Sequence, residues 1–283
     1  MINVLFATCA IGEKYNERCI TSLKAYDKLN YDKSDELVIY TDDVDRYKDI
    51  ETKIKLTVRP FSVNLSGNKF RDNTILKHLM LTSALSNDNE HQVYCWYDCD
   101  AFPIIDKDRM QDYANYDKGI YYKDAHTFAK FEDVLSHHIY TERGKRYNTY
   151  TFLNVTHKDN MLIEYALNDK EEITFPVETC LLFNRDLSSQ SYLQKEKVYI
   201  NTTIDVVKYC MDFHLNDNYG ESFELGIIIG KSFNKIKQMP VIPCMCDFHY
   251  MPADSTQQDI DRYKDRTLYK EFLLWFFEDR NVR

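Results

Sequence analysis

Short apolar runs alternate with amphipathic stretches along the first third of the chain. The runs at 3–7, 36–40 and 93–97 contain no breaker, which is typical of strands buried on both faces, and an alternating run at 54–59 predicts one more strand. Apolar residues recur at helical spacing over about 15–29 and again before the last of these strands. Strands that alternate with helices predict right-handed crossovers. We therefore expect an α/β fold with a Rossmann-like, mixed and mainly parallel sheet flanked by helices, in a single domain.

The pattern becomes less regular in the rest of the chain. Strand character returns at 175–186 and 239–244, and a helix is predicted at about 259–279. Tyrosines are frequent between 106 and 156, which also contains the basic cluster 143–146. Aromatic side chains there suit stacking against sugars or bases, and tyrosine packing in a partly exposed subregion explains the same composition equally well.

Two carboxylates follow the buried strand at 93–97. Asp98 and Asp100 stand two apart on an extended chain, so their side chains point the same way and can share one cation. Their oxygens are hard ligands that favour Mg²⁺ or Mn²⁺ over zinc. The same tripeptide also occurs in solvated turns. The strongly apolar strand at 93–97 favours the cation site, because a solvated turn does not need a buried strand before it.

The carboxyl ends of parallel strands meet at one edge of the sheet, where ligands of such folds bind. This places Thr8 to Ala10, Asp42 with Asp43, and Asp98 with Asp100 along one edge. Helix starts and backbone amides at that edge can hold phosphates, and Lys69, Arg71 and Lys77 are the nearby cations. Each cation alone is more simply a solvated charge, but together they predict an anion site.

Four residues further along the chain are candidate site residues, and each also has a simple structural explanation. Glu178 lies in an apolar run, where an acid needs a partner or a function. Glu221 and Glu224 fall one helical turn apart, and acids in a first turn also simply complement the helix dipole. His249 follows a predicted strand between aromatic residues, where a packed histidine is the commoner situation.

Composition limits the functional classes. The net charge of −9 argues against a broad nucleic-acid-binding face, although it leaves room for a local basic groove. The eight cysteines show no paired CxxC spacing, so neither a zinc site nor a redox motif is indicated. No signal-peptide pattern or apolar run of roughly 20 residues occurs, so we expect a cytoplasmic protein without a membrane span.

With these parts in this order, the chain resembles the GT-A fold nucleotide-sugar glycosyltransferases of the Asp-x-Asp type. The resemblance spans nearly the whole chain, but only the Asp-x-Asp element is a recognised motif. The matching parts are the strand end Phe6 to Ala10, the acid after the second strand, the Lys-bearing helix, Tyr97 to Asp100, the strand Glu178 to Asn184 and the helix start Gly220 to Leu225.

The resemblance implies transfer of a sugar from a nucleotide-diphosphate sugar, with a UDP-linked sugar as the expected donor. Mn²⁺ or Mg²⁺ would stabilise the departing diphosphate as a Lewis acid. Its ligands would be Asp98 and Asp100, with His249 completing the metal site. The residues expected around the donor are Thr8, Cys9, Ala10, Tyr15, Asp42, Arg71, Lys77 and Asp98.

The same resemblance implies that Glu178, Glu221 or Glu224 faces the acceptor, as general base in an inverting reaction or as electrostatic partner in a retaining one. Some inverting relatives carry Glu-Asp at this helix start, whereas this chain has Glu221-Ser222. The identity of the base and the stereochemical outcome therefore stay open. We expect residues 1–105 to form the nucleotide-sugar-binding half and residues 106–283 the acceptor-binding half.

The acceptor is open among a glycan, a protein side chain, a small metabolite and a hydroxymethylated base of viral DNA. The lack of a predicted membrane anchor favours a bacterial or phage enzyme. One alternative is a HAD-like phosphohydrolase that uses Asp98 and Asp100. That class favours Thr or Val where Ala101-Phe102 follows here. The other alternative is a non-catalytic nucleotide-sugar-binding relative.

Overall fold

The computed structural model describes residues 2–61, 69–99, 101–103, 105–122, 125–128, 138–140, 146–148, 173–176, 180–212, 229, 232–233, 236–239 and 244–246. The chain forms two compact units. The first unit comprises Met1–Ser62, His91–Asp117 and Pro240–Arg283, and the second comprises Val63–Glu90 and Lys118–Met239.

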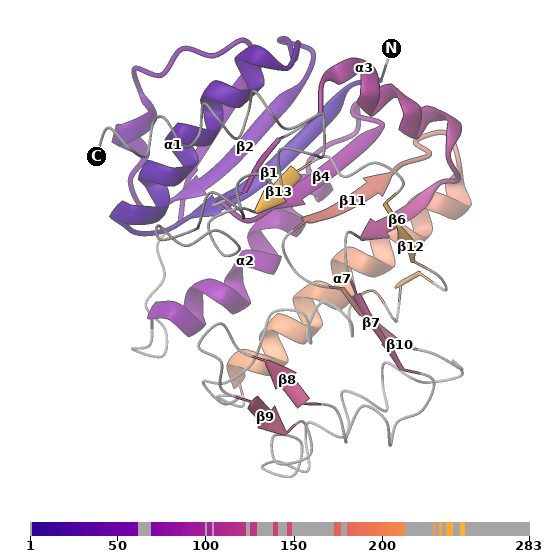
Figure 1. Cartoon of the computed structure of the whole chain (residues 1–283). Coiled ribbons are helices and arrows are strands. Elements are labelled where there is room, and N and C mark those ends of the chain that lie inside the picture. The colour runs from indigo at the N-terminus through magenta and orange to yellow at the C-terminus, as the bar shows by residue number, and fades with distance from the viewer. Residues whose placement is uncertain are drawn as a thin grey trace, which may run out of the picture. The chain divides into compact units, whose positions relative to one another are not determined.

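A parallel sheet is the centre of the first unit. Its strands are β1 (Val4–Ala10), β2 (Glu36–Thr41), β3 (Lys55–Pro60) and β4 (Val93–Tyr97), in the order β4-β1-β2-β3 (Figure 1). Every residue of β1 and β4 is buried, whereas β3 is only partly covered. The unbroken apolar runs are therefore the strands buried on both faces.

The strand order determines where a ligand can approach this sheet. The chain passes from β1 to β2 and β3 on one side, and then returns to β4 on the other side of β1. Such a reversal is a topological switch point, because the connections on its two sides leave in opposite directions. The carboxyl ends of β1 and β4 therefore flank the position at which open α/β sheets bind ligands.

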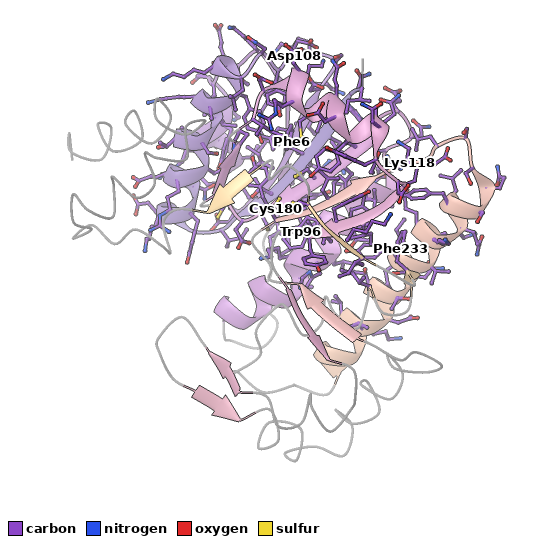
Figure 2. The ribbon with its side chains drawn as sticks, turned by 45° about the vertical axis from the view of Figure 1, so that its right-hand side comes forward. Phe6, Trp96, Asp108, Lys118, Cys180 and Phe233 are labelled. Atoms are coloured by element: carbon purple, nitrogen blue, oxygen red, sulfur yellow. The ribbon has the colours of Figure 1, made fainter. Side chains whose placement is uncertain are left out.

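Helix α1 (Glu13–Lys28) packs against this sheet. The ring of Phe6 on β1 contacts Tyr26 of α1, Tyr31 and Tyr97 of β4 in edge-to-face geometry, with ring centroids 5.0, 5.2 and 6.2 Å apart. Phe6 and Trp96 lie within the packed interior (Figure 2). This aromatic cluster joins α1 to both strands of the switch point.

An ion-pair network stabilises the amino-terminal edge of the same sheet. Asp35, fully buried before β2, accepts a hydrogen bond from the backbone N of Val4 at 3.0 Å. The ammonium of Lys107, in α3 (Lys107–Met110), lies 2.9 Å from a carboxylate oxygen of Asp35 and 2.9 Å from one of Asp32. These contacts stabilise the amino-terminal edge of the sheet, opposite the carboxyl ends of β1 and β4.

Two short strands continue the first unit beyond its parallel sheet. Strand β5 (Ala101–Pro103) pairs antiparallel with β13 (Cys244–Cys246), which comes from the C-terminal part of the chain. The 3-10 helices η1 (Val44–Tyr47) and η2 (Gln111–Asn115) complete the regular elements that are described in this unit.

The second unit contains long helices and short strands. Helix α2 (Lys69–Ser86) packs against α7 (Gln190–Asp212), and β6 (Gly119–Tyr122) pairs antiparallel with β11 (Cys180–Asn184) and parallel with β12 (Lys237–Gln238). Two further antiparallel pairs are β7 (Ala125–Phe128) with β10 (Ile173–Pro176) and β8 (His138–Tyr140) with β9 (Arg146–Asn148). The ring of Phe183 on β11 packs edge-on against Tyr199 of α7 at 4.9 Å.

A buried arginine joins three segments of the second unit. Arg185 is only 2% exposed and follows β11. Its guanidinium donates to Glu196 of α7 at 2.6 and 2.9 Å and to the carboxylate of Asp88, which follows α2. Because the charge is fully paired, it is tolerated in the interior and fixes these segments relative to one another.

The predicted fold class is confirmed, since helices flank a mixed and mainly parallel sheet. Helix α7 was not predicted, although its buried residues Tyr192, Glu196, Tyr199, Thr203 and Val206 recur at helical spacing. The predicted helix at 259–279 lies outside the described residues. The functional division after residue 105 stays a prediction.

Candidate functional site

The carboxyl end of β1 is joined directly to that of β4. The backbone ladder between the two strands ends at Ala7 and Trp96. At the next position Thr8, which is fully buried, donates its hydroxyl hydrogen to the carbonyl oxygen of Tyr97 at 2.8 Å. The Thr8 side chain therefore spans the switch point. Its partner Tyr97 directly precedes the predicted metal ligand Asp98.

Gly12 makes the turn from β1 into α1. Its backbone has φ 89° and ψ 156°, a conformation that is essentially restricted to glycine. A Cβ at this position would meet no atom within 4 Å. Glycine is therefore required here for its backbone conformation and not for space.

The carboxylate of Asp42, directly after β2, caps the start of α1. Both of its oxygens accept a hydrogen bond from the backbone N of Gly12, at 2.9 and 3.0 Å. Because a carboxylate complements the positive end of a helix, this contact stabilises α1 from the neighbouring strand. A phosphate at this helix start would compete with Asp42 for the same amide. The side chain of Asp42 is exposed, and its remaining lone pairs can accept hydrogen bonds from a ligand.

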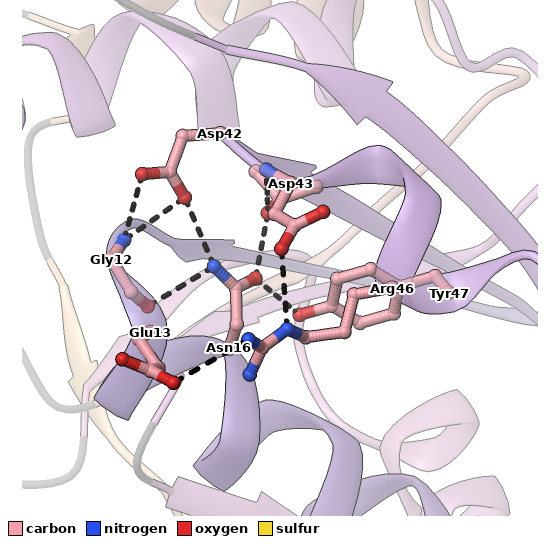
Figure 3. A network of polar contacts seen from close by, with 8 residues as sticks. Gly12, Glu13, Asn16, Asp42, Asp43, Arg46 and Tyr47 are labelled. Carbon is pink, nitrogen blue, oxygen red and sulfur yellow. Dashed lines mark hydrogen bonds and ion pairs between the residues drawn. The ribbon is translucent and has the colours of Figure 1, made fainter.

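Asn16 connects the ends of β1, β2 and η1 (Figure 3). Its carboxamide, 1% exposed, donates to Asp42 at 2.9 Å and to the carbonyl oxygen of Gly12 at 3.1 Å. Its oxygen accepts from the hydroxyl groups of Thr41 at 2.6 Å and Tyr47 at 2.7 Å. Burial raises the pKa of Tyr47, so its hydroxyl keeps the proton that it donates. All four hydrogen-bonding positions of the amide are used, which fixes its orientation.

A second layer of charged groups lies around this network (Figure 3). The guanidinium of Arg46 is 3.2 Å from the carboxylate of Asp43 and 3.8 Å from that of Glu13. Tyr15, in the first turns of α1, is 37% exposed, and the guanidinium carbon of Arg18 lies 5.8 Å from its ring centroid. One face of Tyr15 is therefore covered by a cation.

The Asp-x-Asp element begins in a tight turn after β4. The carbonyl oxygen of Asp98 accepts a hydrogen bond from the backbone N of Ala101 at 2.8 Å, and the side chain of Asp98 is partly exposed. Cys99 is buried. Asp98 is thus partly exposed directly after β4, while Asp100 lies outside the described residues.

The pairing of β5 with β13 joins the strand that follows the Asp-x-Asp turn to the C-terminal part of the chain. Cys246 pairs with Ala101, and the strands are antiparallel. Two residues separate Cys246 from His249 in the sequence, and His249 itself lies outside the described residues.

The predicted ligands are of the kind that a divalent cation binds. Carboxylates are the ligands that Mg²⁺ and Mn²⁺ prefer, and an imidazole can complete such a set. Within the described residues, no three metal-ligating side chains lie together, and two of the three predicted ligands fall outside that part of the chain.

The remaining predicted residues are distributed over both units. Cys9 and Ala10 are buried at the end of β1. Lys77 is buried on α2, and Arg71 lies on the same helix. Their roles in donor binding stay predictions. The predicted catalytic acids Glu178, Glu221 and Glu224 and the metal ligands Asp100 and His249 lie outside the described residues.

Three residues of the site were not predicted from the sequence. Gly12 carries a recognisable signal, because a glycine directly after a buried strand and before a helix indicates a special backbone conformation. Asn16 and Tyr47 carry none, since each acts through partners that only the folded chain brings together.

In the part of the chain that the structure describes, no helix is long and apolar enough to cross a bilayer. No protein-family model and no curated protein matches the sequence. Similar solved structures include the apo form of the bifunctional glycosyltransferase WbbM, which is 12% identical with a TM-score of 0.43 over 84% of this chain and 39% of that chain. This chain thus spans well under half of the WbbM chain.

The apo form of mouse xyloside xylosyltransferase 1 is 9% identical, with a TM-score of 0.42 over 84% of this chain and 85% of that chain. Similarity at this level gives no residue a role. The case for a function therefore rests on the arrangement of the residues at the switch point.

Proposed function

We propose that the protein is a metal-dependent glycosyltransferase, which moves a sugar from a nucleotide-diphosphate sugar to an acceptor hydroxyl. The expected donor is a UDP-linked sugar. The observation that carries this proposal is the position of Asp98, directly after β4 and beside the switch point between β1 and β4. The register of β5 with β13 supports His249 as a third ligand, because Cys246 pairs with Ala101 and only two residues lie between Cys246 and His249 in the sequence. A carboxylate pair with a third ligand at that edge is what a sugar diphosphate bound through a cation requires.

Asp98, Asp100 and His249 would hold the cation. A divalent cation at this place supplies Lewis acidity that stabilises the diphosphate leaving group. The protein's own residues bind and orient the donor. Because a carboxylate repels phosphate, the exposed Asp42 suits the neutral part of the donor, and its free lone pairs can accept from base N–H groups or ribose hydroxyls. The nucleoside would then lie over β1 and β2, with the diphosphate toward β4.

The acceptor side is proposed from the sequence alone. Glu178, Glu221 and Glu224 are the candidates to take the proton from the acceptor hydroxyl or to stabilise the developing charge. A glycan, a protein side chain and a hydroxymethylated DNA base all offer such a hydroxyl.

The test is a screen of nucleotide sugars, with release of the nucleoside diphosphate measured with Mn²⁺, with Mg²⁺ and with EDTA. We expect release with one nucleotide sugar, lost in EDTA and reduced at least about a hundredfold in Asp100→Ala, since the carboxylate is a metal ligand. Asp108→Ala is the matched control, because Asp108 is an exposed acid of α3 in the same unit. It should retain full activity.

Full activity of Asp100→Ala, or of the wild type in EDTA, contradicts the proposal. Hydrolysis of simple phosphoesters without any effect of nucleotide sugars would indicate a phosphohydrolase instead. Stabilisation by a nucleotide sugar in a thermal-shift assay, without release of the nucleoside diphosphate, would indicate a non-catalytic binding protein.

A further inference from the structure

The backbone ladder between β1 and β4 stops just before the Asp-x-Asp element. Its pairs run from Val4 with Val93 to Ala7 with Trp96. Beyond them the connection is the hydrogen bond from the hydroxyl of Thr8 to the carbonyl oxygen of Tyr97, at 2.8 Å. Thr8 is fully buried, so water does not compete for this hydrogen bond.

Because the peptide bond is planar, the hydrogen bond to the Tyr97 carbonyl oxygen also affects the position of Asp98. The carbonyl oxygen of Tyr97, the amide N of Asp98 and the Cα of Asp98 lie in one plane. Holding that oxygen therefore sets the orientation of the peptide plane and, with it, the position of the Asp98 Cα. The next peptide plane is held as well, because the carbonyl oxygen of Asp98 accepts from the backbone N of Ala101 at 2.8 Å.

The side chain of Tyr97 is held independently of Thr8. Its ring packs edge-on against Phe6, with centroids 6.2 Å apart, and its hydroxyl shares a hydrogen bond of 2.5 Å with that of Tyr26. Loss of the Thr8 hydroxyl would therefore leave the ring in place and release the peptide plane that precedes Asp98. The specific consequence is a less well defined carboxylate position.

We propose that Thr8 is a positioning residue of the metal site and not a contact of the donor: its hydroxyl fixes the peptide that places Asp98 for a divalent cation. This inference rests on the proposed function. Thr8 touches neither the cation nor the donor, and it acts through the backbone of β4. A fixed backbone at the partly exposed Asp98 lowers the entropy that is lost when the cation binds, which favours binding.

Binding of Mn²⁺, measured by titration calorimetry and by electron paramagnetic resonance of the free ion, tests this role without any turnover. Thr8→Val keeps the shape of the side chain and removes the hydroxyl. We expect Mn²⁺ to bind about tenfold more weakly, as is usual when a group that orients a metal ligand is lost. Thr8→Ser keeps the hydroxyl and should bind within about twofold of the wild type.

Thr21→Val is the matched control. The Thr21 hydroxyl bonds only to the carbonyl oxygen of Glu17 in its own helix, at 3.0 Å, so the same substitution there should leave Mn²⁺ binding unchanged. In activity assays, Thr8→Val should need about ten times more Mn²⁺ for half-maximal rate and reach a similar kcat at saturation. A protein that is only destabilised in general would not combine a higher Mn²⁺ requirement with an unchanged kcat.

Wild-type Mn²⁺ affinity in folded Thr8→Val overturns the inference, even if its melting temperature is lower. If Thr8→Val cannot be purified, Thr8→Cys replaces it, because a thiol is a weak donor. Thr8→Cys should weaken Mn²⁺ binding about threefold, and unchanged affinity would again overturn the inference. If the wild type binds no Mn²⁺, either alone or with UDP, the proposed function itself fails.

Discussion

The buried carboxamide of Asn16 offers a quantitative test of how the carboxyl edge of the sheet is held together. Asn16→Ala removes two donated and two accepted hydrogen bonds at once. Asp42 keeps its contact with Gly12, but the hydroxyl groups of Thr41 and Tyr47 lose the acceptor to which they donate.

The expected loss of stability follows from these two hydroxyl groups. Thr41 is fully buried and Tyr47 is 3% exposed, so neither gains much water in exchange. A buried donor left without an acceptor costs about 1–3 kcal/mol, and we expect the free energy of unfolding to fall by about 2–4 kcal/mol in total. Since native proteins are stable by about 5–15 kcal/mol, the variant should fold but be clearly weakened.

Asn16→Asp adds a dependence on pH with a definite sign. The new carboxylate would face Asp42 where the amide nitrogen now lies 2.9 Å from it. Two carboxylates so close cannot both ionise without strong repulsion, so the upper pKa of the pair is raised above its unfolded value of about 4. The free energy of unfolding of Asn16→Asp should therefore rise as the pH falls below that raised pKa. The wild type has no such pair of carboxylates and should not show this rise.

Urea unfolding followed by circular dichroism, at pH 8 and pH 5, measures both effects. Ser22→Ala is the control, because Ser22 is equally buried in the same helix but bonds only to the carbonyl oxygen of Cys19. It should change stability by less than about 1 kcal/mol. A loss below about 0.5 kcal/mol in Asn16→Ala, or equal penalties for Asn16→Asp at both pH values, would refute the reasoning.

Two further substitutions test the loop after β1 and the amino-terminal edge of the sheet. Gly12→Ala should lower the free energy of unfolding by about 1–3 kcal/mol, because φ of 89° disfavours a side chain even where a Cβ has space; an unchanged urea midpoint would show that the loop relaxes freely. Hydrogen bonds from Ser34 and Lys107 lower the pKa of Asp32 to about 2, so its carboxylate contributes stability above its unfolded pKa of about 4. The difference between the wild type and Asp32→Asn should be present at pH 7 and disappear between about pH 4 and pH 2, and a difference that persists at pH 2 would contradict this.

The parallel sheet was predictable because its strands are buried on both faces and therefore appear as unbroken apolar runs. The position of Asp98 at a strand end followed from the same pattern, and so did the common edge of Thr8, Asp42 and Asp98. Helix α7 was missed because polar residues such as Glu196 occupy its buried face, where Arg185 from another segment neutralises the charge.

The contacts within the site depend on register, which the sequence pattern does not encode. Thr8 and Tyr97 are 89 residues apart, and their hydrogen bond requires the particular alignment of β1 with β4. The prediction of Thr8 as a donor contact stays a prediction, whereas its hydrogen bond to Tyr97 could not be predicted from the pattern. The pairing of β5 with β13 joins strands of three residues, which are too short for any periodicity to indicate a partner.

The most direct measurement is the anomalous scattering of manganese in crystals grown with Mn²⁺ and UDP. The account predicts an anomalous peak bound by the carboxylates of Asp98 and Asp100 and by the imidazole of His249, with the diphosphate on the same ion and the nucleoside toward Asp42. A bound nucleotide without manganese at these carboxylates, or an Asp98–Asp100 turn directed away from every ligand, would contradict it.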